Sequence, residues 1–353
     1  MDLTKYKIGY WPYTPACDVA GDRRRFVFYA SERKFSFEIA SSKKQYDIVY
    51  LTSNCNCTEW IAYKKKYPGT KIIFELIDSY LLENLNRKNL FRGAARFIRG
   101  KENRVYIDYR KAFRKMISAA DAVVCSTPVQ RESLLAYNKN VHISLDYFSN
   151  DINDHKIDYS THSKLKLVWE GQAYTAYNLL SINNALQKLR NEVELHIITD
   201  PVIRLPVKML NKKTEQVLKK IKCDFIIHPW KKETFSKLIA ASDLSIIPIL
   251  KTDKLAWNKP ENKLLLLWET GIPVLTSPTP AYRRVMAGAS VEGVCETEDE
   301  WVKKIIDFKN KPVHEKQKIA KLAENYLLHH HSKEIILKNW DAIFESVLPS
   351  NGQ

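Results

Sequence analysis

Two glutamates and two lysines gather in one short segment, Asn258–Met286, of this 353-residue chain. Glu261 and Glu269 are eight positions apart, which on an α-helix means about 12 Å of rise and about 80° of rotation. Their carboxylates can therefore hydrogen-bond the two ends of one long ligand that carries hydroxyl groups. Lys259 and Lys263 place positive charge near the first carboxylate. These residue types at this spacing predict a site for a sugar joined to a nucleoside diphosphate.

The residues around these side chains are typical of a helix. Asn258 can cap its amino end and Pro260 suits its first turn. Gly271 marks its end, so we expect a helix from about 260 to 270. Its first N–H groups and the positive end of its dipole, with Asn262 nearby, would seat a diphosphate. The alternative is that neither glutamate binds a ligand. Glu261 would then be a first-turn acid that interacts favourably with the helix dipole, and Glu269 would be a solvated residue on the helix surface.

A loop of the amino-terminal half is a second candidate. Trp11–Arg25 follows a predicted strand, and open α/β sheets bind ligands at the carboxyl ends of their strands. Gly21 would allow this loop to come close to a phosphate. Asp22, Arg23 and Arg24 are candidates to bind the acceptor or its phosphate. Equally, a run of arginines is often a solvated surface cluster.

Asp78 is the second candidate catalytic residue, after Glu261. It ends the predicted strand of the segment Phe74–Tyr80, FELIDSY, and should reach the same edge of the sheet. A polar residue that caps a loop would have the same pattern, so both interpretations stay open.

Short apolar runs alternate with helical stretches along the chain, which is the pattern of β-α-β units and parallel sheets. The first group of predicted strands comprises Lys7–Trp11, Asp47–Leu51, Lys71–Ile77, Ala122–Cys125 and Val141–Leu145. The second group comprises Leu165–Trp169, Val193–Ile198, Asp224–His228, Leu244–Ile249 and Pro273–Thr276. The length of the chain also favours two domains of similar size.

The polar stretch Ser149–Ser163 lies between the two groups and shows neither apolar period. We place the domain boundary there, with an amino-terminal domain of residues 1–160 and a second domain of residues 161–325. Residues 326–353 are expected to form a terminal helix, whose apolar stripe within Glu334–Val347 packs across both domains.

The Asn258–Met286 segment resembles the Glu-x7-Glu element of retaining GT-B glycosyltransferases, a large family that includes many lipopolysaccharide and capsule enzymes. The Gly-Ile-Pro-Val run after Glu269 strengthens the resemblance, and Ala119–Ser126 and Ala240–Pro248 resemble strands of the family's two domains. The resemblance implies an α/β fold of two Rossmann-like domains, with parallel sheets facing a central cleft and a terminal helix that crosses back. It also implies that Glu261 contacts the donor sugar near the reacting carbon and that Glu269 binds the ribose hydroxyls.

The chain departs from this family after the first strand of the second domain. The family usually carries an Arg and a Lys there, whereas Trp169–Asn178 reads WEGQAYTAYN. We assign the diphosphate contacts to Lys259 or Lys263 instead. Gly171 and Gln172 are expected to form a loop whose backbone N–H groups approach the phosphates.

The composition is strongly basic. Lys and Arg outnumber Asp and Glu by 56 to 40, for a formal charge of +16, so polyanions of any kind will be attracted. No recognition-helix pattern, zinc-finger spacing or RNA-binding signature accompanies this charge, and nucleic acid is not an expected partner. The six cysteines form no CxxC pair. We predict reduced thiols, no metal, and no cofactor beyond the nucleotide-sugar donor.

The basic run 90–116 interleaves Arg and Lys with Phe, Ile, Val and Tyr. Such a surface suits an anionic membrane that holds a lipid-linked acceptor, or it is a solvated helix pair. The amino terminus lacks the apolar region of a signal peptide, and no run of about 18 apolar residues is present. The sequence predicts a cytoplasmic protein, with peripheral binding to the inner face of the membrane as an open addition.

Together these features predict a glycosyltransferase that moves a sugar from a nucleoside diphosphate to a hydroxyl of a glycan or lipid-linked acceptor, with retention, in cell-surface polysaccharide biosynthesis. Two alternatives stay open. A nucleotide-sugar epimerase or hydrolase on the same fold would turn over the donor without an acceptor. A non-catalytic subunit would bind the sugar nucleotide only.

Overall fold

A computed structural model of the chain describes residues 2–82, 108–161, 163–203 and 211–348. These residues fall into two compact units. The first unit takes the described parts of Met1–Tyr147, Asn258–Pro260 and Lys333–Gln353. The second takes those of Phe148–Trp257 and Glu261–Ser332. The first change of unit, after Tyr147, therefore comes just before the polar stretch where the sequence suggested a boundary.

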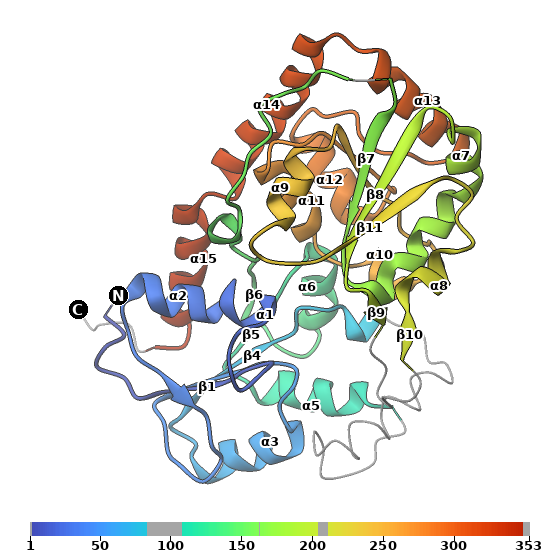
Figure 1. Cartoon of the computed structure of the whole chain (residues 1–353). Coiled ribbons are helices and arrows are strands. Elements are labelled where there is room, and N and C mark those ends of the chain that lie inside the picture. The colour runs from blue at the N-terminus through green and yellow to red at the C-terminus, as the bar shows by residue number, and fades with distance from the viewer. Residues whose placement is uncertain (1, 83–107, 162, 204–210, 349–353) are drawn as a thin grey trace. The chain divides into compact units, whose positions relative to one another are not determined.

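The first unit is built on a parallel sheet of six strands in the order β2-β1-β3-β4-β5-β6 (Figure 1). Its strands are β1 (Ile8–Trp11), β2 (Glu38–Ile39), β3 (Ile48–Leu51), β4 (Lys71–Glu75), β5 (Ala122–Cys125) and β6 (Val141–Ile143). Its described helices are α1 (Ala20–Arg23), α2 (Phe26–Arg33), α3 (Cys57–Lys66), η1 (Tyr80–Leu82), α5 (Arg110–Ala119), α6 (Pro128–Leu135) and α15 (Lys333–Glu345).

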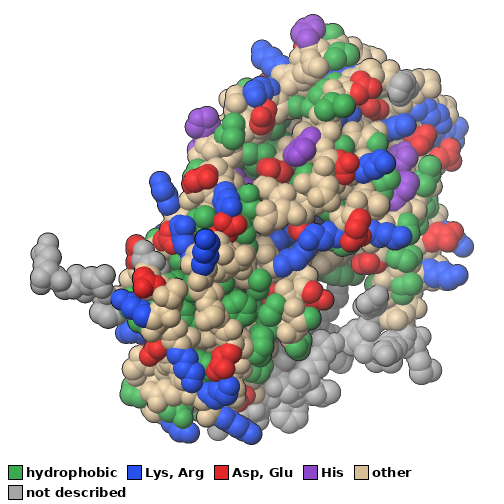
Figure 2. All heavy atoms as spheres, turned by 60° about the vertical axis from the view of Figure 1, so that its left-hand side comes forward, with side chains coloured by type: hydrophobic (Ala, Val, Ile, Leu, Met, Phe, Trp, Pro, Cys, Tyr) green, Lys and Arg blue, Asp and Glu red, His purple; other side chains and the backbone are tan. Residues whose placement is uncertain are grey.

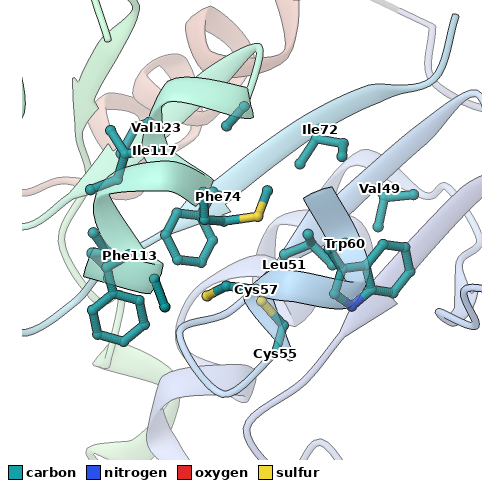
Figure 3. Packing of buried hydrophobic residues seen from close by; sticks show 14 of the residues in the cluster. Val49, Leu51, Cys55, Cys57, Trp60, Ile72, Phe74, Phe113, Ile117 and Val123 are labelled. Atoms are coloured by element: carbon teal, nitrogen blue, oxygen red, sulfur yellow. The ribbon is translucent and has the colours of Figure 1, made fainter. Parts of the chain in front are cut away.

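Both faces of this sheet are covered, which is why β3 and β5 are apolar throughout instead of alternating. On one face, Trp60 of α3 and Phe113 of α5 pack against Leu51 and Phe74 (Figure 3). On the other face, α2 and α15 meet over the sheet, where the ring of Trp340 stacks on that of Tyr29 at 5.4 Å.

The second unit is built on a parallel sheet of five strands in the order β11-β8-β7-β12-β13. Its strands are β7 (Leu165–Glu170), β8 (Val193–Thr199), β11 (Phe225–Pro229), β12 (Leu244–Ile247) and β13 (Val274–Thr276), with a small antiparallel pair β9 (Val202–Ile203) and β10 (Lys212–Lys213). Its described helices are η2 (Ser149–Asp151), η3 (Ala173–Ile182), α7 (Asn183–Lys188), α8 (Thr214–Leu218), α9 (Phe235–Ala240), α10 (Lys254–Trp257), α11 (Asn262–Glu269), α12 (Pro280–Gly288), α13 (Glu298–Asn310) and α14 (Val313–His330).

Helix α11 starts later than its sequence suggested. Glu261 is the residue before the helix, and its carbonyl accepts the first intrahelical bond from Leu265 N–H at 3.1 Å. The expected cap, Asn258, groups with the first unit instead. The stop is as expected: Gly271 has a φ of +77°, a left-handed conformation that favours glycine.

The polar stretch after Tyr147 is attached to the second unit and is not free chain. Lys156 is buried, and its ammonium donates to Ser242 O at 2.6 Å. Tyr159 Oη donates to Gly271 O at 2.8 Å. The backbone of this stretch therefore follows the end of α11, which polarity alone did not reveal.

All six cysteines are free thiols, and four of them are buried. Lys and Arg side chains are interspersed with Asp and Glu over the face shown in Figure 2. In the described ranges, no helix combines the length and the apolar character needed to cross a membrane. Most of the basic run 90–116, where the sequence suggested a membrane surface, lies outside those ranges.

Candidate functional site

The order of strands reverses beside β7. From β7 the chain proceeds to β8 and β11 on one side, and then returns to β12 and β13 on the other. Open α/β sheets bind ligands outside the carboxyl ends of the strands at such a reversal. In this unit that place is the end of β7, where the following loop begins at Gly171, together with the end of β12, whose loop leads to α11.

The ammonium of Lys263 lies at the carboxyl end of β7. Its Nζ donates to Glu170 O at 2.6 Å and is 4.7 Å from the ring centroid of Trp169. A Cβ atom at Gly171 would lie 2.5 Å from this Nζ, so a larger residue would displace the ammonium. Although Lys263 belongs to α11, it brings a full positive charge to the strand-order reversal.

Gly171 therefore has a different role from the one expected. Its N–H donates to Ile198 O at 3.1 Å, so this group is occupied within the sheet. What the glycine provides is room for Lys263. Gln172 is exposed and precedes η3, whose first N–H groups have no partner inside the helix. A donor-binding role for Gln172 stays a prediction.

Glu261 lies at the amino end of α11 and is only 6% exposed. Its Oε1 accepts from Nη2 of Arg284, on α12, at 2.6 Å. Its side chain makes no capping bond to its own helix. Oε2 is buried and lacks a hydrogen-bond partner within the described part of the chain. Asn262, half-buried, is the first residue of the helix.

Glu269 lies at the other end of α11. The helix connects the carboxyl end of β12 to the amino end of β13, and these strands are parallel. Glu269 is therefore at the amino edge of the sheet, where its carbonyl accepts from His155 Nδ1 at 2.9 Å. The expectation that both glutamates bind the two ends of one ligand does not fit this geometry, because ligands of open sheets lie outside the carboxyl edge.

Lys259 and Asp78 are brought together within the first unit. Their Nζ and Oδ1 atoms are 3.5 Å apart, and Tyr80 Oη lies 3.4 Å from Asp78 Oδ2. The neighbouring Asn258 carbonyl accepts from Ser79 Oγ at 3.0 Å. Lys259 thus has a carboxylate partner. Catalytic use of Asp78 stays a prediction.

Asp22 holds the loop that follows β1. Its carboxylate, fully buried, accepts from Tyr10 Oη at 2.5 Å, from the N–H of Tyr13 at 2.8 Å and from the N–H of Thr14 at 3.1 Å. A Cβ atom at Gly21 would lie 2.8 Å from the Tyr13 ring. The space at this glycine is thus filled by a tyrosine, which explains the residue without a phosphate.

The arginine run beside Asp22 is not one uniform surface. Arg23 and Arg24 are half-buried, and their use in acceptor binding stays a prediction. Arg25 is fully buried: its Nε donates to Glu75 Oε1 at 2.5 Å, and its Nη1 donates to Ser144 O at 3.0 Å and to Asp146 at 3.1 Å. Burial raises the pKa of Glu75, and Arg25 opposes that rise.

Sequence reasoning missed Glu75 and Arg284, and it read Arg25 only as part of the arginine run, to bind an acceptor phosphate or to be solvated, whereas Arg25 is fully buried. The signal for Glu75 was an acid at the end of an otherwise apolar strand. Neither arginine gave such a signal, because its partner lies far along the chain. No group of three His, Cys, Asp or Glu side chains in the described residues is arranged to hold a metal ion.

Comparisons with known proteins give a likeness of structure. No family model matches the chain. No curated protein matches its sequence. HepE of Anabaena, solved with UDP and glucose, superposes with a TM-score of 0.61 at 12% identity, over 97% of this chain and 100% of HepE. WaaG, described as a glycosyltransferase of lipopolysaccharide biosynthesis, gives 0.55 at 14% identity, over 97% of this chain and 100% of WaaG.

The chain has the GT-B fold. TarM, also similar, gives a TM-score of 0.57 at 12% identity, and 84% of this chain matches 54% of TarM. The chain therefore spans about half the length of TarM. As the sequence predicted, the GT-B fold is present with its two parallel sheets.

Proposed function

We propose that this chain is a glycosyltransferase that binds a nucleoside-diphosphate sugar at the carboxyl edge of the second unit's sheet. The observation that carries the proposal is the position of Lys263, whose ammonium lies at the strand-order reversal. A diphosphate needs positive charge and N–H donors in one place, and this lysine and the first turn of α11 supply both. The GT-B fold supports the choice of donor, since HepE was solved with UDP and glucose.

The proposed transfer breaks the bond between the sugar's anomeric carbon and the diphosphate oxygen, and forms one to the acceptor hydroxyl oxygen. The hydroxyl proton passes to the leaving phosphate oxygen, so no separate strong base is needed. Lys263 and the helix start stabilise the charge that develops on the diphosphate. Glu261 hydrogen-bonds a hydroxyl of the donor sugar and holds it for attack on the same face, which retains the anomeric configuration.

The acceptor in this proposal is a hydroxyl of a glycan or of a lipid-linked sugar, as in the polysaccharide enzymes that the sequence resembles. The description of WaaG, a structural neighbour, supports the choice. Peripheral membrane contact through the run 90–116 belongs to the same proposal, because a lipid-linked acceptor would be reached from the membrane surface.

The test is thermal unfolding of the purified protein with UDP, UDP-glucose, GDP and GDP-mannose. A ligand that binds only the folded state at about 100 times its Kd stabilises it by about 2.7 kcal/mol. We expect the ligands that carry one of the two nucleobases, uracil or guanine, to raise the Tm. Lys263→Met should abolish that rise, because it removes the charge at the end of β7.

Lys237→Met is the matched control, since Lys237 is an exposed lysine on α9 of the same unit. It should respond to the ligand as the unmodified protein does. Lys259→Met tests which of the two lysines, Lys259 or Lys263, contacts the diphosphate. We expect this variant to keep the Tm rise. An unchanged response in Lys263→Met would contradict the proposed site. Donor turnover without any acceptor would favour the hydrolase or epimerase alternative.

A further inference from the structure

The carboxylate of Glu261 is held from outside its own helix. A residue that precedes a helix commonly folds its side chain back onto the first N–H groups, but Glu261 makes no such bond. Its Oε1 is instead 2.6 Å from Nη2 of Arg284, on the neighbouring helix α12. The pair is asymmetric: the Glu261 side chain is 7% exposed and that of Arg284 is 40% exposed.

The ion pair with Arg284 does not satisfy the second carboxylate oxygen of Glu261. Oε2 is buried and has no hydrogen-bond partner among the described residues. A buried acceptor left in this state destabilises the folded protein. Its position at the amino end of α11, on the edge that binds ligands in open sheets, suggests that a ligand hydroxyl satisfies it.

The other polar groups near Glu261 are tyrosines. Burial, with a smaller contribution from Glu261, raises the pKa of Tyr282 on α12 and of Tyr326 on α14. Both hydroxyls therefore stay neutral, and neither balances a carboxylate. In the described structure, Arg284 is the cation that pairs with Glu261.

We infer that Arg284 is a positioning residue: it holds Oε1 of Glu261 by a hydrogen bond, which leaves Oε2 for a hydroxyl of the donor sugar. The inference rests on the proposed transfer. It adds a residue from a separate helix to the site, and that residue acts through Glu261 without itself touching the reacting atoms. Arg284 then affects the reacting complex more than it affects binding of the nucleotide.

The experiment compares Arg284→Met, Arg284→Lys and Arg283→Met by UDP release from UDP-glucose, with a glycan acceptor. Arg283 is the matched control, since it is the adjacent arginine on α12 and pairs with Glu296 instead. We expect Arg284→Met to lower kcat on the order of 10- to 100-fold, with the Tm rise from UDP unchanged. Arg284→Lys should recover part of the loss, and Arg283→Met should match the unmodified protein.

The split between kcat and nucleotide binding separates positioning from simple damage. If Arg284 only positions Glu261, its loss lowers kcat and leaves the Tm rise from UDP, whereas damage to the fold lowers both. Equal kcat values for Arg284→Met and Arg283→Met would overturn the inference, as would a loss of UDP response that parallels the loss of kcat. If Arg284→Met does not fold, Arg284→Lys against Arg283→Met gives the same comparison. Failure of the unmodified protein to respond to UDP or to any other donor would instead reject the proposed function.

Discussion

Lys263 and Glu269 belong to one helix, yet they lie at opposite edges of the sheet that the helix crosses. Sequence spacing gives the rise and rotation between two side chains, but it does not show which end of the helix meets a ligand. The direction of α11 between two parallel strands provides that information. The amino end, with Glu261 and Lys263, is the end at which we propose that a diphosphate sugar binds.

This difference gives a prediction for Glu269. We expect Glu269→Ala to keep the Tm rise that the best nucleotide produces, because its carboxylate lies at the amino edge of the sheet. Thermal unfolding with and without that nucleotide measures it, beside Lys263→Met. A response lost in both variants would mean that the ligand extends along the whole helix, as the sequence alone suggested.

For single residues, the sequence indicated the segment that carries the candidate site, but it did not indicate which side chains pair with its residues. Glu261 and Lys263 stand out through residue type and through their place at the start of a helix. Arg284 does not, because an arginine 23 positions away in sequence from its partner leaves no local signal. Asp22 and Gly21 were read as ligand residues, and their contacts with Tyr13 explain both without a ligand.

Helix α15 shows how one element completes the first unit. Asp341, on α15, accepts from Arg33 Nε and from Tyr29 Oη at 2.9 Å each, and both donors lie on α2. Burial alone would raise the pKa of Asp341, but the hydrogen bonds from Arg33 and Tyr29 outweigh it and lower the pKa below its usual 3.8. The contribution of this contact is therefore present above that value and is lost as the pH falls through the lowered pKa.

We expect Asp341→Asn to lower the free energy of unfolding by about 1–2 kcal/mol at pH 7, and by less at pH 3. Urea unfolding followed by circular dichroism at the two pH values measures this. Asp307→Asn, at an exposed position of α13, is the control and should change little. A difference between Asp341→Asn and the unmodified protein that stays constant with pH would contradict the assignment.

Among the elements, the long apolar strands were predictable and the shortest were not. The ten strands read from the sequence appear within a few residues, since buried parallel strands need continuous apolar runs. The two-residue strands β2, β9 and β10 are too short to show any period. The stretch Ser149–Ser163 was read as a linker because of its polarity, whereas Lys156 and Tyr159 attach it to the second unit.

For the whole molecule, the charge of +16 makes anionic surfaces the first partners to test. We expect flotation with vesicles containing anionic lipid, and none with neutral vesicles. Replacing the exposed Lys111 and Lys115 of α5 by glutamine should weaken flotation at least about tenfold, at about 1 kcal/mol per basic residue near the surface.

The matched control replaces Lys318 and Lys321, both exposed on α14, and removes the same charge. Equal losses from the two double variants would show that net charge alone drives the binding. Flotation with neutral vesicles, or no flotation at low salt, would count against the membrane contact.

The place of α15 in the first unit also has a consequence for synthesis on the ribosome. Trp340 and Phe344 pack against Tyr29, although the second unit is made between α2 and α15. The sheet of the first unit therefore emerges with an apolar face that α2 covers only in part. Such a nascent chain exposes aromatic surface until α15 has been made, and a variant that ends before Lys333 should aggregate instead of forming a shorter stable protein.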